Sequence, residues 1–233
     1  MLIKTIIMGK IRFTDNKMRK KLFQTKIASY AAFICGIRLL WYFLTHSFSI
    51  MVKPAAGVLL IADPFLKDPN FMRTVVLLTE HRNDGTIGFV INRQFENTLD
   101  ELLPEVEGHQ LPVFYGGPVQ MNTIHFLHRY PNEIPGGIEV MKGVYWGGDF
   151  DSVVQLINSG KADPEKIRFF IGYSGWSPGQ LDAEMEEKTW LTVEAVRKLV
   201  FHTNAEEIWK DSLKHLGGEY EMMINFPIDP QLN

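Results

Sequence analysis

The chain has 233 residues, and its shares of hydrophobic residues (45%) and charged residues (22%) are ordinary for a globular protein. Its single cysteine, Cys35, excludes an intramolecular disulfide and leaves residues 51–233 without thiol chemistry, which fits a reducing, cytoplasmic setting. The net charge of −3 conceals an asymmetry, because residues 1–50 (nine Lys/Arg, one acid) sum to +8 and residues 51–233 (15 Lys/Arg, 26 acids) sum to −11. That acidic excess disfavours direct nucleic-acid binding by residues 51–233, because few basic residues are left to neutralise phosphates.

The first fifty residues differ in character from the rest. Five basic residues between Lys17 and Lys26 precede an apolar run over residues 27–50, and Arg38 divides that run. A central arginine costs about 2.5–3.5 kcal/mol in a membrane span, so the run is a poor one. Three interpretations stay open: upstream sequence translated from a wrong start with Met51 as the true N-terminus, a membrane anchor through residues 27–50, or a signal peptide. We therefore expect a basic, apolar extension over 1–50 and a single domain over 51–233.

From residue 51 onward, short β-forming runs alternate with turn residues. Apolar runs predict strands over 57–62, 74–79, 86–92, 113–115, 123–128 and 167–173. Asp84-Gly85 predicts a hairpin turn, and a second hairpin is expected around Gly143. Because hairpins are mixed with helices and no regular strand–helix repeat appears, we expect an α+β fold with a mixed or antiparallel sheet.

Capping signals and helical periodicity mark the helices. Thr98 and Glu101 form a capping box that opens a short helix before Pro104. An apolar face over 150–157 predicts a helix that Gly160 ends, and two more are expected over about 192–201 and from Asn204 to 217–218.

The most distinctive stretch is the corner at residues 172–185. A strand over 167–173 is expected to run into a glycine-rich turn and then directly into a helix. Ser177 as N-cap, Pro178 at the first helical position and Gln180 three residues after the cap predict the start of that helix. Tyr173 and Trp176 give this turn two large amphipathic rings. The corner is therefore the surface on which we expect a binding site.

Several motifs in order resemble those of the YqgE/AlgH family of uncharacterised bacterial proteins over about residues 55–216. They are Gly57-Val-Leu-Leu-Ile-Ala-Asp-Pro64, Asp68-Pro-Asn-Phe71, Arg73-Thr-Val-Val76, Glu80-His81, Gly88-Phe-Val-Ile-Asn92, Gly116-Gly-Pro-Val119, Leu127-His128, Gly172-Tyr-Ser-Gly-Trp176, Gly179-Gln-Leu181 and Trp190. The resemblance implies an open, barrel-like, largely antiparallel sheet with flanking helices. It implies no established enzyme activity, and one branch of the family is linked to transcriptional control of exopolysaccharide synthesis. We expect no cofactor. The sequence departs from the family pattern at Gln94, where proline is usual, and at Asp182, where glutamate is usual.

Each catalytic interpretation of the motifs is incomplete. Ser174 lies between strand and helix, but a nucleophile elbow needs glycine where Trp176 stands. The acidic run over 182–187 is typical of a solvated helix start, and Asp182 is its most distinctive member. His125 and His128 point to opposite faces of a strand, so they form no metal pair, and we expect no metal site.

Three hypotheses about function follow from these residues. The first is a non-enzymatic binding or regulatory domain, whose candidate pocket is formed by Asn92, His128, Tyr173, Trp176, Gln180 and Asp182. The second is an enzyme of unknown class that uses His128 or His81 with Asp182. The third is a membrane-tethered form of the first, if residues 27–50 are an anchor. The expected partner is a small molecule or a protein, and the first hypothesis is preferred because no complete catalytic set can be assembled.

Overall fold

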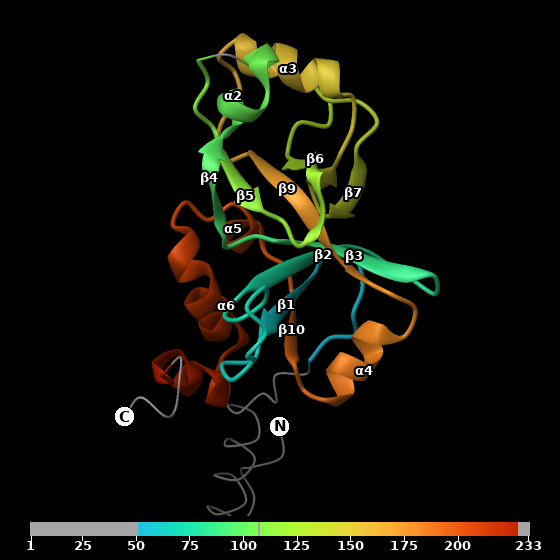
Figure 1. The fold of residues 1–233 in the computed structure, drawn as a ribbon, viewed down its shortest axis with the longest axis vertical. Coiled ribbons are helices and arrows are strands. Elements are labelled where there is room, and N and C mark those ends of the chain that lie inside the picture. The colour runs from blue at the N-terminus through green and yellow to red at the C-terminus, as the bar shows by residue number, and fades with distance from the viewer. Residues whose placement is uncertain (1–50, 107, 228–233) are drawn as a thin grey trace, which may run out of the picture. The chain divides into compact units, whose positions relative to one another are not determined.

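The structure is a computed structural model that describes residues 51–106 and 108–227 (Figure 1). The predictions made for residues 1–50 lie outside this range. None of the helices within the range combines the length and the apolar character that a membrane span requires.

Ten strands and several short helices make up the described chain. The strands are β1 (Val58–Ala62), β2 (Val75–Arg82), β3 (Gly85–Val90), β4 (Gln94–Thr98), β5 (Pro112–Tyr115), β6 (Val119–His128), β7 (Ile138–Met141), β8 (Val144–Trp146), β9 (Ile167–Trp176) and β10 (Trp190–Glu194). The α-helices are α2 (Leu99–Leu102), α3 (Phe150–Asn158), α4 (Gln180–Glu186), α5 (Arg197–Val200) and α6 (Ile208–Leu216). The 3₁₀ turns are η1 (Pro104–Val106), η2 (Ala205–Glu207) and η3 (Gly218–Asn225).

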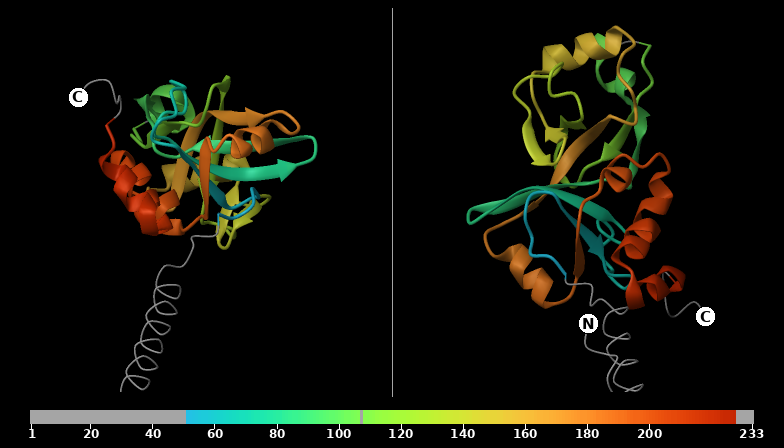
Figure 2. Two further views of the ribbon diagram at one scale, coloured as in Figure 1. Left: turned by 90° about the horizontal axis from the view of Figure 1, so that it is seen from below. Right: turned by 180° about the vertical axis from the view of Figure 1, so that it is seen from behind.

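The strands form one curled sheet in the order β10-β1-β2-β3-β9-β6-β8-β7, with β4 and β5 attached beside β9. Every pairing is antiparallel except β5 with β9, which is parallel. Figures 1 and 2 show α2 and α3 at one end of the sheet, with α4, α5 and α6 around the other strands. These observations confirm the predicted α+β class and its mixed, largely antiparallel, barrel-like sheet.

Strand β9 is central because it belongs to both parts of the sheet. Its first half pairs with β5 and β6, and residues 174–176 pair with β3. Between the two halves Gly172 has a φ of 64°, a left-handed conformation that favours glycine. A Cβ atom at this position would lie 2.6 Å from the Gly117 carbonyl oxygen and 2.8 Å from that of Val119. The bend therefore depends on the missing side chain.

Three apolar clusters form the core. The largest lies between the sheet and helices α5 and α6 and contains Phe89, Phe170 and Trp209. A second packs the sheet against α2 and α3 around Phe169. The third joins α4 to the sheet through Trp176, Trp190 and five buried aliphatic side chains of β1, β2 and β3, together with Leu181.

Two local predictions were wrong. Residues 190–194 form strand β10 and only 197–200 are α-helical, because Trp190 to Glu194 pair along the whole of β1. Long-range pairing here overrides the helical periodicity. The predicted cap is also displaced, since Gly179 is the N-cap of α4 with a φ of 74° and β9 runs on to Trp176. Ser177 nevertheless keeps half of the predicted capping box, because its backbone N–H donates to Gln180 Oε1 at 3.0 Å.

Candidate functional site

Trp176 and Gln180 at the corner are tied together by Glu184. One carboxylate oxygen of Glu184, Oε2, accepts from Trp176 Nε1 at 2.9 Å and from Trp190 Nε1 at 2.8 Å. The other, Oε1, accepts from Gln180 Nε2 at 3.0 Å. These bonds fasten the first helical turns of α4 to β9 and β10. Sequence analysis singled out Asp182 among the acids of this run, whereas the carboxylate that joins the two indoles is that of Glu184.

A hollow of about 480 Å³ opens beside this corner, and we call it the outer hollow. Three segments that are distant in sequence form it: the β2–β3 hairpin, the start of β6, and the end of β9 with the turn that follows. Its lining comprises Glu80, Arg82, Asp84, Gly85, Thr86, Ile87, Val119, Tyr173, Gly175, Trp176, Ser177 and Pro178. Arg82 forms ion pairs with Glu80 and with Asp84, so the acids exceed the bases by one along this wall.

A second hollow of about 180 Å³ adjoins the first through Arg82, Gly85, Thr86 and Ser177, and we call it the polar hollow. Its wall includes His81 and Asp182, which come from β2 and from the first turn of α4. His81 Nδ1 lies 2.7 Å from Thr86 Oγ1, and no hydrogen bond joins these described residues His81 and Asp182. The structure thus brings together one of the two predicted histidines and the predicted carboxylate.

His128 belongs to the sheet interior and lines neither hollow. Its ring is fully buried, Nδ1 accepts from the Tyr130 backbone N–H at 3.2 Å, and Nε2 lies 2.9 Å from the Gly147 carbonyl oxygen. This network assigns the proton to Nε2, which donates to Gly147. Burial lowers the pKa of His128, because charging the ring without water is costly. Its role in this geometry is to join β6 to the segment after β8.

Asn92 also holds backbone and lines neither hollow. Its Oδ1 accepts from Val75 N–H at 2.8 Å and its Nδ2 donates to the Arg73 carbonyl at 2.9 Å. Arg73 has a φ of 53°, so the amide fixes an unfavourable backbone conformation just before β2. Asn92 therefore holds the backbone before β2 in place from its position just after β3.

Ser174 has no access to a substrate. The residue is fully buried and its hydroxyl donates to the Gly116 carbonyl at 3.0 Å. The serine therefore closes the contact between β9 and the glycine-rich turn after β5. Within the described residues, no group of three or more His, Cys, Asp or Glu side chains is placed to hold a metal ion.

Comparisons with known proteins agree with this fold. A family model described as AlgH-like matches residues 59–221. The chain belongs to the AlgH-like family. A UPF0301 protein of Chlorobium limicola is 45% identical over 181 residues, which cover 78% of this chain and 97% of that protein. One from Cytophaga hutchinsonii is 38% identical over 178 residues, covering 76% and 98%.

Solved structures extend the comparison. The solution structure of the AlgH protein from Pseudomonas aeruginosa has a TM-score of 0.61 and 29% identity, covering 76% of this chain and 98% of that one. A protein from Corynebacterium diphtheriae shares the fold with a TM-score of 0.58 at 22% identity, covering 75% and 94%. The predicted resemblance to the AlgH family is therefore confirmed, and the matched family is one of uncharacterised proteins.

Of the six predicted pocket residues, the structure gathers four at the corner. Tyr173 and Trp176 line the outer hollow and Asp182 the polar hollow, while Gln180 is bound to Glu184. Sequence reasoning missed the β2–β3 hairpin as the opposite wall. A hairpin tip with charges at Glu80, Arg82 and Asp84 was a signal, but its proximity to β9 depends on the pairing of β3 with residues 174–176.

Proposed function

We propose that this AlgH-like chain is a non-enzymatic binding domain whose ligand occupies the outer hollow and the adjoining polar hollow. The observation that carries the proposal is the convergence of three distant segments on one hollow of about 480 Å³. Its wall combines the Tyr173 ring and apolar Ile87 and Val119 with a rim of ionised groups. Mixed apolar and polar walls of this volume are typical of small-molecule sites.

The charge of the rim limits which ligands the outer hollow can bind. Glu80 and Asp84 face a single Arg82, which both of them pair with, so the rim has little positive charge to spare for an anion. A neutral or cationic ligand therefore fits the outer hollow better than a phosphate. The same reasoning disfavours DNA, because residues 51–233 contain 26 acids and 15 bases.

A regulatory role, which the family resemblance implies, is proposed to run through a bound small molecule or protein instead of direct contact with DNA. We place this action in the cytoplasm, since residues 51–233 contain no cysteine and so need no oxidising compartment. A bound metabolite would change the surface at the tip of the β2–β3 hairpin, whose residues Arg82, Asp84 and Gly85 line the outer hollow.

A ligand screen by thermal shift, followed by NMR mapping, tests this proposal. Ile87→Arg places a long charged side chain in the outer hollow, and we expect it to abolish stabilisation by any compound that stabilises the native protein. Ile138→Arg makes the same substitution at an exposed position of β7 that lines neither hollow, so it serves as the matched control and should keep the response. A ligand whose binding is unchanged in Ile87→Arg would overturn the location of the site. If no small molecule stabilises the native protein, protein partners are tested next by capture. A partner of this site must be captured by the native protein and lost in Ile87→Arg.

An enzyme is the second candidate, and one observation favours it: His81 and Asp182 share the wall of the polar hollow. An imidazole and a carboxylate from separate elements are the minimum for acid–base chemistry. Assays against panels of esters, amides and phosphoesters, with His81→Gln and Asp182→Asn side by side, decide this point. An activity that both variants lose equally would replace the binding proposal, whereas equal activity in all three proteins marks a contaminant.

A further inference from the structure

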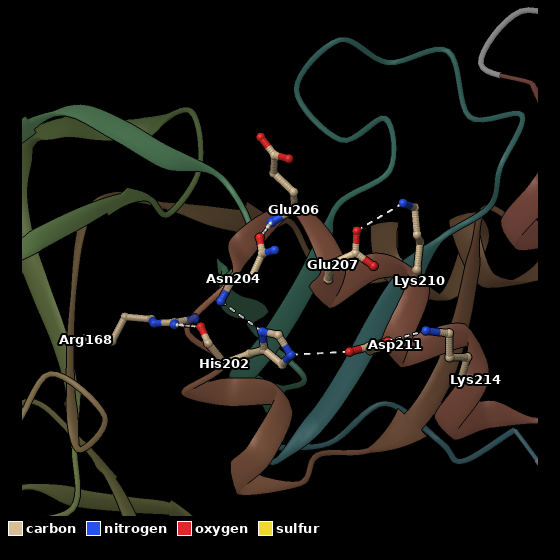
Figure 3. Close-up of polar contacts among 8 residues, drawn as sticks. All are labelled: Arg168, His202, Asn204, Glu206, Glu207, Lys210, Asp211 and Lys214. Atoms are coloured by element: carbon tan, nitrogen blue, oxygen red, sulfur yellow. Dashed lines mark hydrogen bonds and ion pairs between the residues drawn. The ribbon is translucent and has the colours of Figure 1, made fainter.

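Arg168 is a buried cation with no ionised partner in the part of the chain that the structure describes. Only 5% of the residue is exposed, although it stands near the start of the central strand β9. Nη1 donates to the Ile91 carbonyl at 3.0 Å and Nη2 donates to the His202 carbonyl at 2.5 Å, the second of which is drawn in Figure 3. The Cζ atom lies 4.2 Å from the centre of the Phe114 ring. Among the described residues, no carboxylate comes within ion-pair distance of this guanidinium.

A third hollow, of about 300 Å³, lies against this side chain on the other half of β9 from the proposed corner site. Its wall includes Phe114 and Phe201 as apolar surfaces and Gln94 and Thr203 as exposed polar groups. The strand register explains the grouping, since Gln94 pairs opposite Phe114 and Phe114 pairs beside Phe170, two residues from Arg168 on the same face of β9. The amide, the ring and the guanidinium therefore share one face of the sheet.

The described groups around Arg168 satisfy only part of its hydrogen-bond donors and do not neutralise its charge. A guanidinium has five N–H donors, and two backbone carbonyls satisfy only part of them. Removing a cation from water is costly unless an opposite charge compensates, and neutral carbonyls compensate it only partly. Burial lowers the pKa of Arg168 to about 10, so the group is still charged at neutral pH. In contrast to Arg82 at the hairpin, which already has two acids, Arg168 has its charge available.

We propose that the hollow beside Arg168 is a second ligand site, which binds a small molecule with one carboxylate and a compact apolar body. The flat fork of the guanidinium matches a carboxylate, and Phe114 and Phe201 accept the apolar part. The volume of about 300 Å³ limits the ligand to a small one. Glu165 on the rim is exposed and negative, which disfavours dianions such as phosphate relative to monoanions. The site is independent of the corner hollows, which have a different wall and the opposite charge preference.

Benzoate is the probe that tests this site, with benzamide as its uncharged analogue and inorganic phosphate as the dianion. Titrations of the full chain are followed in ¹H–¹⁵N spectra, including the side-chain Nε–H of Arg168. We expect saturable shifts at Gln94, Phe114, Arg168 and Thr203 with benzoate. Benzamide should bind more than about tenfold more weakly, because charge-assisted hydrogen bonds are about twice as strong as neutral ones.

Two variants make the result decisive. Arg168→Met keeps the length of the side chain without its charge and should lose the difference between benzoate and benzamide. Glu165→Gln removes the rim charge, leaves Arg168 in place, and should bind benzoate as tightly as the native protein or more tightly. If Arg168→Met does not fold, the benzoate-to-benzamide ratio in the native protein and in Glu165→Gln still decides. Equal binding of the two probes, shifts that map to another surface, or no saturation would each overturn the proposal.

Discussion

An ionised side chain holds each end of β9, a cation at the start and an anion at the end. These two side chains differ in their burial and in their hydrogen-bond partners. At the start, the Arg168 cation is buried and meets two backbone carbonyls and an aromatic ring. At the end, the Trp176 indole is held by the Glu184 carboxylate, which is partly exposed and accepts from three side-chain N–H groups. Glu184 therefore has its hydrogen bonds completed within the domain while it keeps contact with water, whereas Arg168 has given up water without gaining an anion.

This difference indicates what each end is suited to do. A completed network with three donors rigidifies the corner and positions the wall of the outer hollow. The buried charge of Arg168 has no anionic partner among the described residues, and a ligand with a negative group can supply one. Between them, Gly172 makes the bend that lets one strand serve both ends. The predictions below test these three roles in order of the expected effect.

Gly172→Ala should have the largest effect on stability. The new Cβ atom would meet the carbonyl oxygens of Gly117 and Val119 at 2.6 and 2.8 Å, and a φ of 64° is itself unfavourable for alanine. Backbone strain and overpacking together are expected to cost about 3 kcal/mol or more. Urea unfolding followed by circular dichroism measures the loss. Gly160→Ala, with a φ of 70° and no atom within 4 Å of its added Cβ, isolates the cost of the backbone conformation. Equal losses in both variants would show that the close approach at Gly172 is unimportant.

Arg168→Ala should follow, because it opens a cavity and leaves the carbonyls of Ile91 and His202 without their donor. We expect a loss of about 3 kcal/mol, since buried unpaired acceptors and lost packing both contribute. Arg168→Met fills most of the volume and removes the cost of burying a charge, so its loss should be only about 1–2 kcal/mol. Chemical unfolding of both variants gives the two values. A methionine variant as unstable as the alanine variant would mean that the carbonyl bonds outweigh the desolvation of the guanidinium.

Glu184→Leu should cost less, because Glu184 is only partly buried. Its loss leaves the indole N–H groups of Trp176 and Trp190 without an acceptor, for which we expect about 2 kcal/mol. Glu184→Gln keeps an acceptor oxygen and should lose about 1 kcal/mol, the difference between a charge-assisted and a neutral bond. Unfolding is measured with tryptophan fluorescence as the probe, since both indoles change their surroundings. If the glutamine and leucine variants behave alike, the carboxylate does not connect the two rings.

The sequence alone predicted the sheet class and most strands, because continuous apolar runs such as those at residues 58–62 and 75–78 are typical of strands buried on both faces. The helix predicted over 192–201 was wrong at its start, because residues 190–194 form β10. Its partner is β1, more than a hundred residues earlier, and no local pattern contains that information. The predicted contact between Ser177 and Gln180 is present, but the predicted cap position is wrong, because the helix begins at Gln180 with Gly179 as its N-cap.

The candidate site was predictable only in part, for a similar reason. Tyr173 and Trp176 were evident as large rings beside glycines, whereas Glu184 looked like any member of the acidic run. Which carboxylate of that run faces two indoles depends on the packing of α4 against β9 and β10. Arg168 gave no signal, since one arginine in an apolar strand is usually taken as an exposed position. Burial of that strand on both faces is a tertiary property.

The buried His128 and the half-buried His125 should make the stability moderately dependent on pH, an effect that does not involve Arg168 or Glu184. Burial lowers the pKa of His128 and of His125 below the unfolded value near 6.5, so the unfolded chain binds more protons in this range. Their stabilisation is therefore complete above about pH 6.5 and is lost as the pH falls towards the folded pKa values. Unfolding free energies measured in urea from pH 7.5 to 5 should decrease, and His128→Gln should flatten the slope. A slope unchanged in that variant and in His125→Gln would assign the effect to the carboxylates.

Asp182→Asn should have the smallest effect on stability, although Asp182 stands on the same helix as Glu184. The side chain is exposed in the first turn of α4 and no hydrogen bond connects it to the two indoles. Removing one charge near a helix N-terminus is worth less than about 1 kcal/mol. The variant is therefore a clean probe of the polar hollow, since any large change in ligand response must come from binding and not from unfolding. A loss of stability equal to that of Glu184→Leu would contradict this separation, because it would give the dipole of a seven-residue helix the same weight as the bonds that fasten it to β9 and β10.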